Sequence, residues 1–240
     1  MLLADMHIHA LYGVDDGART KEEMINMVRQ SYEDGVRVMC LTPHYHPGQF
    51  GDNRRKVVQA YAELSEYVKE TIPKLLICLG NELRYDSGAA GWLTSGDCHT
   101  INGTDFVLVD FLAEDDYDFI TEGVRRISNT GYRPVLAHAE RYSAFFRDRR
   151  TLAAMRADGV IIQLDAGSLL GDYGRAIKKQ SQQLMDKGLV DVVSSDSHRP
   201  EGSRYCSMKD AAEFIEKKYG REAAEALCRT NIMDIIYDRL

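Results

Sequence analysis

Short apolar, β-rich runs alternate with amphipathic stretches of helical length along most of the chain. The apolar runs predict strands at Leu2–His7, Val36–Leu41, Leu75–Leu79, Phe106–Asp110, Pro134–Ala137, Val160–Leu164 and Val190–Ser194. The amphipathic stretches predict helices at Lys21–Asp34, Arg54–Glu70, Asp116–Asn129, Thr151–Ala157, Ile177–Lys187, Asp210–Tyr219 and Arg221–Arg229. Strands that alternate with helices imply a parallel sheet. We therefore predict an α/β fold with a barrel-like sheet of about seven parallel strands and surrounding helices.

The chain shows no internal boundary. No proline- or serine-rich linker and no internal repeat interrupts its 240 residues, so we expect residues 1–240 to form a single domain. The net charge of −7, without any block of basic residues, argues against nucleic acid or an anionic membrane as a partner. No apolar run has the length of a membrane span or of a signal-peptide core. The five scattered cysteines suit a reducing compartment, so we expect a cytoplasmic protein.

Residues that bind metal ions follow the predicted strands. The strand ends carry or lead into His7, His9, His44, Glu82, Asp110, His138, Asp165, Asp196 and His198. Barrel enzymes place their reactive groups at the C-terminal ends of their strands. Residues two apart on a strand share a face, so His7 and His9 can bind one ion together, and Asp196 and His198 repeat this spacing.

Each of these residues alone is as well explained by an ordinary hydrogen-bonded histidine or a capping carboxylate. Several carboxylates close together repel one another unless cations lie between them, so their number on one edge favours a metal cluster. Imidazole combined with carboxylate suits manganese, iron or zinc, and no thiolate takes part.

The motifs resemble those of a known superfamily. Asp5-Met-His7-Ile-His9, His44, His138 and Asp196-Ser-His198 are similar to the four motifs of the PHP (polymerase and histidinol phosphatase) superfamily. Three further segments narrow the resemblance to one group of proteins within this superfamily. They are Val14-Asp15-Asp16-Gly17, Gly80-Asn-Glu82 and His138-Ala-Glu-Arg141-Tyr142. They are similar to the bacterial capsular-polysaccharide-type protein-tyrosine phosphatases, which dephosphorylate bacterial tyrosine kinases. The resemblance extends over essentially the whole chain.

This resemblance implies a distorted TIM-like barrel with three metal ions, usually manganese. Carried over to this sequence, one ion would be bound by His7, His9, Glu82 and Asp196. A second would be bound by Glu82, Asp110 and His138, and a third by Asp16, His44 and His198. Asp165 matches no ligand position of the family. Asp110 is a departure, because the family commonly has glutamate there.

Arginines complete the predicted site. Arg141 is the first choice for binding phosphate, because it lies three residues past His138. The family also uses an arginine shortly after the Asp-x-His motif, where Arg199 and Arg204 compete and Arg204 is preferred. These two predicted catalytic residues would stabilise charge on the phosphoryl oxygens.

Charge balance favours a phosphoester substrate. The five imidazoles, if neutral, and the four carboxylates carry a charge of −4, which three divalent ions would turn into a surplus of +2. A phosphate monoester dianion offsets that surplus, and a metal-bound water has its pKa lowered enough to attack phosphorus. We therefore expect hydrolysis of phosphotyrosine in a protein, with a bacterial tyrosine kinase of capsule or exopolysaccharide synthesis as the partner.

Three other functions are considered. A small-molecule phosphatase of the same superfamily, such as histidinol phosphatase, would share the metal site, and a non-catalytic metal-stabilised binding module would lack activity. Cys78 and Arg84 match the Cys-x5-Arg pattern of cysteine phosphatases. That match is attributed to chance, because the residues between them are not small and Glu82 would repel the substrate. The oligomeric state is not predicted.

Overall fold

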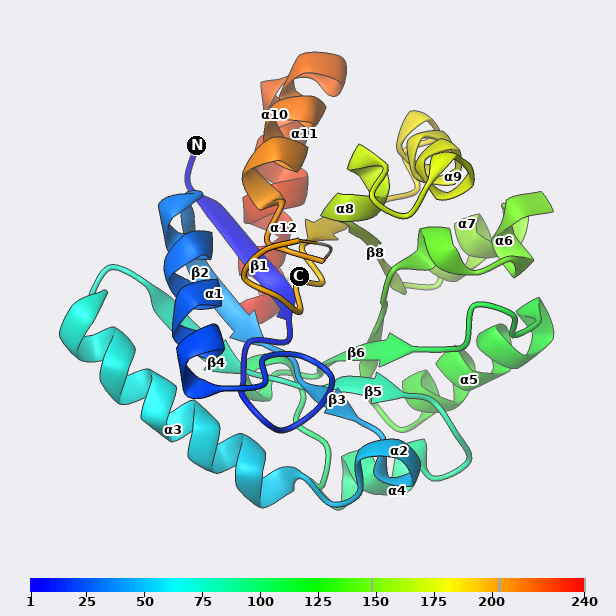
Figure 1. The fold of residues 1–240 in the computed structure, drawn as a ribbon. Helices are drawn as coiled ribbons and strands as arrows, with labels where there is room; N and C mark the ends of the chain where they lie inside the picture. Colours follow the sequence, from blue (N-terminus) through cyan, green and yellow to red (C-terminus); the bar gives the residue numbers. More distant parts are fainter. Residues whose placement is uncertain (148, 203, 240) are drawn as a thin grey trace.

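Parallel strands form the centre of the fold (Figure 1). The computed structural model describes residues 1–147, 149–202 and 204–239. Its strands are β1 (Leu3–Ile8), β2 (Val36–Leu41), β3 (His44–Tyr45), β4 (Leu76–Leu79), β5 (Glu82–Arg84), β6 (Phe106–Asp110), β7 (Arg133–Leu136), β8 (Ile161–Asp165) and β9 (Val192–Ser194). They hydrogen-bond in the orders β1-β2-β4 and β3-β5-β6-β7-β8-β9, and every pair is parallel.

The two sheets are parts of one curled surface. β3 follows β2 after two residues, and β5 follows β4 after two residues. Backbone pairing continues across these interruptions, because Gly80 N donates to Leu41 O at 2.8 Å and Glu82 N donates to Pro43 O at 3.1 Å. At the other edge, Ile8 forms a parallel bridge with Ser197, just beyond β9. The predicted barrel-like parallel sheet is therefore confirmed, with the two short strands β3 and β5 in addition to those predicted.

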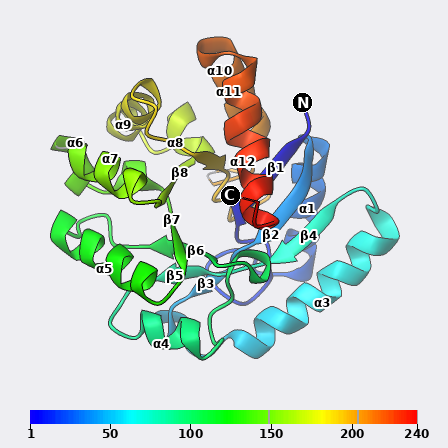
Figure 2. The ribbon, with the colours of Figure 1, turned by 180° about the vertical axis from the view of Figure 1, so that it is seen from behind.

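The inward face of the sheet is apolar in its N-terminal half. Its cluster of buried side chains includes Ala4, Met6, Val38, Cys40, Phe106, Leu108, Val135 and Val192, together with three isoleucines of α12 (Asn231–Ile236). The helix α12 lies next to β1 when the molecule is seen from behind (Figure 2). Since apolar residues and α12 fill this end, the polar residues of the inward face gather at the opposite, C-terminal end of the strands.

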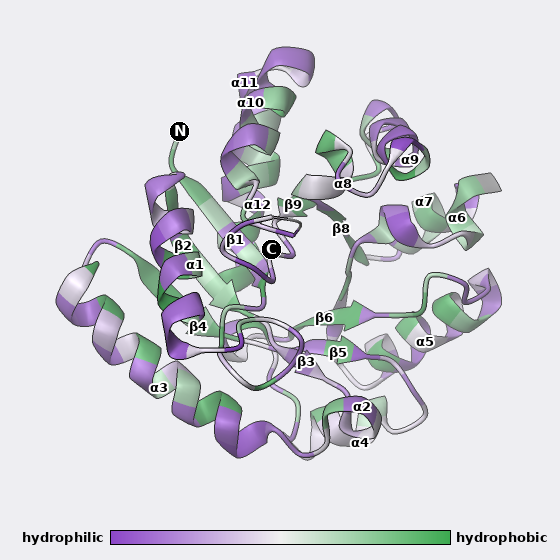
Figure 3. Cartoon of the chain, in the orientation of Figure 1, coloured by the Kyte–Doolittle hydropathy of each residue, from purple (hydrophilic) through white to green (hydrophobic). Residues whose placement is uncertain are grey.

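Amphipathic helices pack around the outside of the sheet. The long ones are α1 (Lys21–Glu33), α3 (Arg54–Thr71), α5 (Tyr117–Asn129), α7 (Arg150–Ala157), α9 (Arg175–Asp186) and α10 (Met208–Tyr219), close to the predicted ranges. Hydrophobic and hydrophilic residues alternate along them, as expected for helices that cover a core on one side (Figure 3). Two N-caps follow from sequence: Thr20 accepts from Glu23 N before α1, and Asp116 accepts from Phe119 N before α5.

Shorter helices were not predicted. They are α2 (Pro47–Phe50), α4 (Ala89–Thr94), α6 (Ala144–Arg147) and α8 (Ala166–Leu170), with the short helical turns η1 (Ile101–Gly103) and η2 (Ala139–Arg141). The predicted helix Arg221–Arg229 continues further, as α11 (Arg221–Glu225), η3 (Ala226–Thr230) and α12. The helix is therefore longer than predicted. Its additional residues Ile232, Ile235 and Ile236 are buried in the inward cluster. Within the described ranges, no helix is both long and apolar enough to cross a membrane.

Candidate metal centre

An irregularity in β1 directs His7 and His9 toward the inside of the sheet. Ala4 and Met6 belong to the inward cluster, so strict alternation would direct Ile8 inward as well. The register with β2 shifts between Asp5 and Ile8, and Ile8 packs in the outer hydrophobic core instead. The two histidine side chains consequently converge, with their Nε2 atoms 3.2 Å apart. Bulges of this kind commonly reorient side chains next to active sites.

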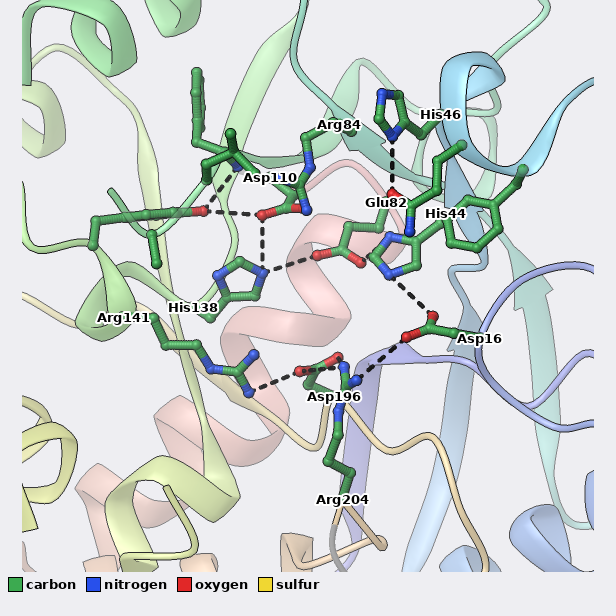
Figure 4. Close-up of a pocket in the computed structure, with 16 residues that line it drawn as sticks. Asp16, His44, His46, Glu82, Arg84, Asp110, His138, Arg141, Asp196 and Arg204 are labelled. Carbon is green, nitrogen blue, oxygen red and sulfur yellow. Dashed lines mark hydrogen bonds and ion pairs between the residues drawn. The ribbon is translucent and has the colours of Figure 1, made fainter. Parts of the chain in front are cut away.

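A cavity of about 270 Å³ opens at the C-terminal ends of the strands. Figure 4 shows acidic, imidazole and guanidinium groups pointing into it from different elements. Eight predicted site residues line it: Asp16, His44, Glu82, Asp110, His138, Arg141, Asp196 and Arg204. The other three predicted ligands, His7, His9 and His198, are buried and contact these carboxylates.

Glu82 lies at the centre of the cluster. Its Oε2 atom is 3.3 Å from His7 Nε2, 3.2 Å from His9 Nε2 and 2.9 Å from His44 Nδ1. Its Oε1 atom is 3.0 Å from His138 Nε2. Glu82 begins β5, and the register of β5 with β3 places it directly opposite His44. A buried carboxylate with imidazoles on both oxygens has the geometry of a bridging ligand.

Two aspartates, Asp16 and Asp196, extend the cluster outward from Glu82. Asp16 Oδ1 is 3.4 Å from His44 Nε2 and 3.3 Å from His198 Nε2. Asp196 Oδ1 is 3.3 Å from His7 Nε2.

Donor atoms within 4.8 Å of one another are found in the sets His9–Asp16–His44–His198, His7–His9–Glu82 and His44–Glu82–Asp110. The sets contain the predicted group Asp16, His44 and His198 and add His9 to it. His138 joins through Asp110, 3.3 Å away, and through Glu82. All nine predicted ligand positions thus lie in one connected cluster, and their assignment to particular ions stays a prediction.

Hydrogen bonds behind the histidines fix which nitrogen faces the cluster. His9 Nδ1 is 2.8 Å from Asp15 Oδ2, and His7 Nδ1 is 3.2 Å from Gln163 Oε1. His198 Nδ1 is 3.0 Å from the main-chain oxygen two residues before it. Because an acceptor behind Nδ1 holds the proton there, the Nε2 lone pairs of His7 and His9 are directed at the carboxylates of the cluster. The Nε2 lone pair of His198 faces Arg204 Nη2, 2.8 Å away.

The electrostatics of the cluster fit divalent cations. Burial lowers the pKa of His9, but the carboxylates of Asp15 and Glu82 outweigh it and raise this pKa well above its ordinary value. Burial likewise lowers the pKa of His138, but the neighbouring carboxylates of Asp110 and Glu82 outweigh it and raise this pKa to about 9. Burial would raise the pKa of Glu82, but the surrounding histidines hold it well below its usual range. Protons on imidazoles therefore offset the carboxylates here, a role that metal ions can take over.

The buried oxygen Oε2 of Glu82 also supports this fit. Glu82 Oε2 and His138 Nδ1 have no hydrogen-bond partner although both are inaccessible to solvent. Unpaired buried polar atoms are rare and require an explanation. Glu82 Oε2 lies within 3.3 Å of ring nitrogens of His7, His9 and His44, and a cation held by these groups would satisfy it.

Backbone conformation marks the same site. His138 (φ 34°) and Asp196 (φ 50°) both lie in the left-handed region, which residues other than glycine rarely adopt. Such conformations persist where the surrounding structure fixes them, often at functional sites.

The arginines are arranged around Asp196. Arg141 Nη2 is 2.9 Å from Asp196 Oδ2 and 2.5 Å from Asp165 Oδ2. Arg204 Nη2 is 3.3 Å from Asp196 Oδ2, and its guanidinium lines the cavity. Arg199 instead donates to main-chain oxygens, including that of Asp16 at 2.8 Å. Of the two arginines that compete in the sequence, Arg204 therefore faces the cavity.

Several residues of the site were not predicted from the sequence. Arg84 lines the cavity and forms an ion pair with Asp110 at 2.5 Å, whereas Cys78 lies in the apolar inward cluster. This separation agrees with treating the Cys-x5-Arg match as chance. Asp15 and Gln163 orient histidines, and both were visible only as polar residues beside a motif or inside a strand.

The fold and the site together define a metal-binding barrel of the PHP type. The family model described as "Capsular polysaccharide synthesis, CpsB/CapC" matches residues 3–237, so the chain belongs to this family. This confirms the family resemblance seen in the sequence.

The chain is similar to tyrosine-protein phosphatase CpsB of Streptococcus pneumoniae, with 30% identity over 243 residues, which span 99% of this chain and 100% of the relative. It is also similar to tyrosine-protein phosphatase YwqE of Bacillus subtilis (strain 168), with 28% identity over 221 residues, which span 92% of this chain and 86% of the relative. A solved structure from work on YwqE and CpsB, described as "unique metal-dependent tyrosine phosphatases", matches with a TM-score of 0.89 and 25% identity. The match covers 98% of this chain and 95% of that one.

Proposed function

We propose that this chain uses manganese to hydrolyse phosphotyrosine on a bacterial tyrosine kinase of capsule or exopolysaccharide synthesis. The class of enzyme, a metal-dependent tyrosine-protein phosphatase, follows from family membership and from the similar proteins. The observation that supports the proposal most is the cluster of imidazoles and carboxylates around Glu82, with two arginines at its edge.

The donor set would hold three divalent ions. We assign His7, His9, Glu82 and Asp196 to one, Glu82, Asp110 and His138 to a second, and Asp16, His44 and His198 to the third. Ions held there would supply Lewis acidity, which polarises phosphoryl oxygens and acidifies water. The ligands combine nitrogen and oxygen without sulfur, which suits manganese and also iron or zinc.

The arginines of the chain would bind and orient the phosphoryl group. The guanidinium groups of Arg141 and Arg204 line the cavity beside Asp196, where their donors can reach an anion. Guanidinium matches the geometry of phosphate oxygens, and donors fixed before the reaction stabilise charge that develops in the transition state. Arg141 is held by ion pairs with Asp165 and Asp196, so this side chain needs little reorganisation. Arg204, in contrast, would have to leave His198 Nε2, 2.8 Å away, for an ion to bind there.

One wall of the cavity suits an aromatic ring. Phe50 lines it and is stacked on His44, with ring centroids 5.4 Å apart and an angle of 7° between the planes. Leu112 also lines it and is 49% exposed. Apolar side chains above an anion-binding floor favour an aryl phosphate such as phosphotyrosine.

Binding of histidinol phosphate would require a carboxylate in the cavity to pair with the ammonium group of this substrate. The acidic residues that line the cavity, among those the structure describes, are Asp16, Glu82, Asp110 and Asp196, and all four are assigned to ions. This absence of a spare carboxylate favours phosphotyrosine over the small-molecule alternative.

Comparing manganese-dependent turnover of a phosphotyrosine peptide and of histidinol phosphate tests the proposal. We expect the peptide to be hydrolysed faster, and faster hydrolysis of histidinol phosphate by orders of magnitude would refute it. His7→Ala or Asp196→Ala should lose most activity and keep the fold. His99→Ala is the matched control, because His99 lines a different cavity. A manganese-loaded sample inactive on every phosphomonoester would instead support a binding module.

A further inference from the structure

Gln163 and Asp165 form a polar pair beneath the predicted site. They are two residues apart on β8, so their side chains point to the same face of the sheet. Both are completely buried. Neither matches a ligand position of the family, and neither lines the cavity. A buried amide and a buried carboxylate at this depth require a structural or functional reason.

The contacts of Gln163 fix the orientation of its amide. Its Oε1 accepts a hydrogen bond from His138 N at 2.7 Å, and its Nε2 donates to Asp165 Oδ1 at 2.8 Å. A main-chain N–H can only donate and a carboxylate can only accept, so the reverse orientation would lose both bonds. His7 Nδ1, 3.2 Å from the same Oε1, must therefore carry the proton. The Nε2 lone pair of His7 is consequently directed at Glu82 and the other ligands.

Asp165 continues the chain of contacts to Arg141. Its Oδ2 forms an ion pair with Arg141 Nη2 at 2.5 Å. The same guanidinium lies 4.1 Å from the ring of Tyr173. Asp165 and the Tyr173 ring thus hold Arg141 from two sides, and Asp196 is not its only partner.

We propose that Gln163 and Asp165 are positioning residues that couple the metal ligands His7 and His138 to the phosphate-binding Arg141. Gln163 sets the tautomer of His7 and the backbone position of His138, while Asp165 sets the position of the guanidinium. The proposal rests on the proposed function for the role of Arg141. Its metal-binding half does not require a substrate.

Calorimetric titration of the metal-free protein with Mn²⁺ tests Gln163. We expect Gln163→Leu to weaken Mn²⁺ binding by about 10–100-fold, the usual effect of removing the partner behind a ligand. Gln180→Leu is the matched control. Gln180 is also buried, and it donates to Phe145 O at 3.1 Å and accepts from Arg149 at 2.6 Å, neither of which is a predicted ligand. The control should lose similar stability and bind Mn²⁺ as the unmodified protein does.

Inhibition by inorganic phosphate tests Asp165. Asp165→Asn keeps the size of the side chain and removes its charge, so Arg141 loses one of its two ion pairs while the amide of Gln163 retains an acceptor. We expect Mn²⁺ affinity within about threefold of the unmodified protein, and a roughly tenfold rise in both the phosphate inhibition constant and the KM for a phosphotyrosine peptide. The value of kcat should change less than KM.

Three results would overturn the proposal. They are unchanged Mn²⁺ affinity in Gln163→Leu, equal loss of Mn²⁺ affinity in the Gln180→Leu control, and unchanged phosphate inhibition in Asp165→Asn. Failure of the proposed function has a different signature. The unmodified protein would then bind Mn²⁺ without hydrolysing phosphotyrosine, and the two glutamine variants would still decide the role of Gln163.

Discussion

Replacing Arg141 by alanine separates phosphate binding from metal binding. Arg141 is the one cation seen in contact with the side chain of Asp165 in the described part of the chain, and it shares Asp196 with Arg204. The variant should therefore leave Asp165 without a counterion, while Asp196 keeps the guanidinium of Arg204, 3.3 Å away. We expect the fold to weaken, the metal site to remain, and catalysis to fall.

The contacts set the size of each effect. Removing one partner of a buried ion pair destabilises a protein by roughly 3–5 kcal/mol. For a chain of this length, each kcal/mol lowers Tm by about 2–4 °C, so a fall of about 6–20 °C is expected. Loss of a preorganised donor to the transition state lowers kcat/KM by about 10²–10³. Mn²⁺ affinity should not fall, because a cation 2.9 Å from the candidate ligand Asp196 has been removed.

Three measurements on one preparation test this reasoning. They are calorimetric Mn²⁺ affinity, Tm of the metal-free protein, and kcat/KM on a phosphotyrosine peptide. The double variant Arg141→Ala/Asp165→Asn is the control, because a neutral residue at position 165 needs no counterion. It should recover most of the Tm and none of the activity. Loss of Mn²⁺ binding in step with activity would show that Arg141 supports the metal ligands instead of the substrate.

Three other variants test separate parts of the structure. Cys78→Ser should keep manganese-dependent activity, because Cys78 is buried in the inward cluster, and complete loss with metal still bound would revive thiol chemistry. Asp110→Glu should lower the Mn²⁺ concentration for half-maximal activity by up to about tenfold, because the longer carboxylate can extend further toward an ion held with His138 and Glu82. A weaker Mn²⁺ response would show that the shorter side chain is already well placed. Burial and the charge of Asp165 raise the pKa of Glu140 from 4.5 to about 7, so the folded state holds a proton that the unfolded state releases. The stabilisation that the Glu140 carboxyl group contributes is complete below pH 4.5 and is lost as the pH rises through 7. The corresponding fall in the free energy of unfolding is on the order of 3 kcal/mol. Glu140→Gln should therefore gain stability relative to the unmodified protein between pH 5 and pH 8 in denaturant titrations, and parallel pH curves would contradict this origin.

The sequence predicts the order of strands and helices well because each long element carries a clear period. It could not show β3 and β5, which pair over two and three residues and begin with the polar His44 and Glu82. The shift of register in β1 was also hidden. One extra residue in a strand leaves the apolar composition unchanged, yet it decides whether Ile8 or the two histidines face inward.

The predicted ligands come together because parallel strands end at one edge of the sheet. The residues that orient them could not be found in the same way, since those contacts join distant segments. Gln163 meets the side chain of His7 across 156 positions of the chain and the main chain of His138 across 25. The choice between Arg199 and Arg204 depended on a loop whose conformation, with a φ of 62° at Arg204, no motif specifies.

The ion pairs of the cavity explain how a chain with a net charge of −7 can bind a phosphate dianion. Arg141 and Arg204 are paired with Asp196 at 2.9 Å and 3.3 Å, and Arg204 is also 3.5 Å from Asp16. The carboxylates that we assign to metal ions therefore also neutralise the cations that we assign to phosphate. Ions at the ligand positions would offset these carboxylates and increase the positive field at the guanidinium groups. Because linkage is reciprocal, phosphate would in turn strengthen ion binding, so the two affinities should be coupled. The overall charge of the chain is then a poor guide to its substrate, because the sign of the field at the cavity depends on metal occupancy.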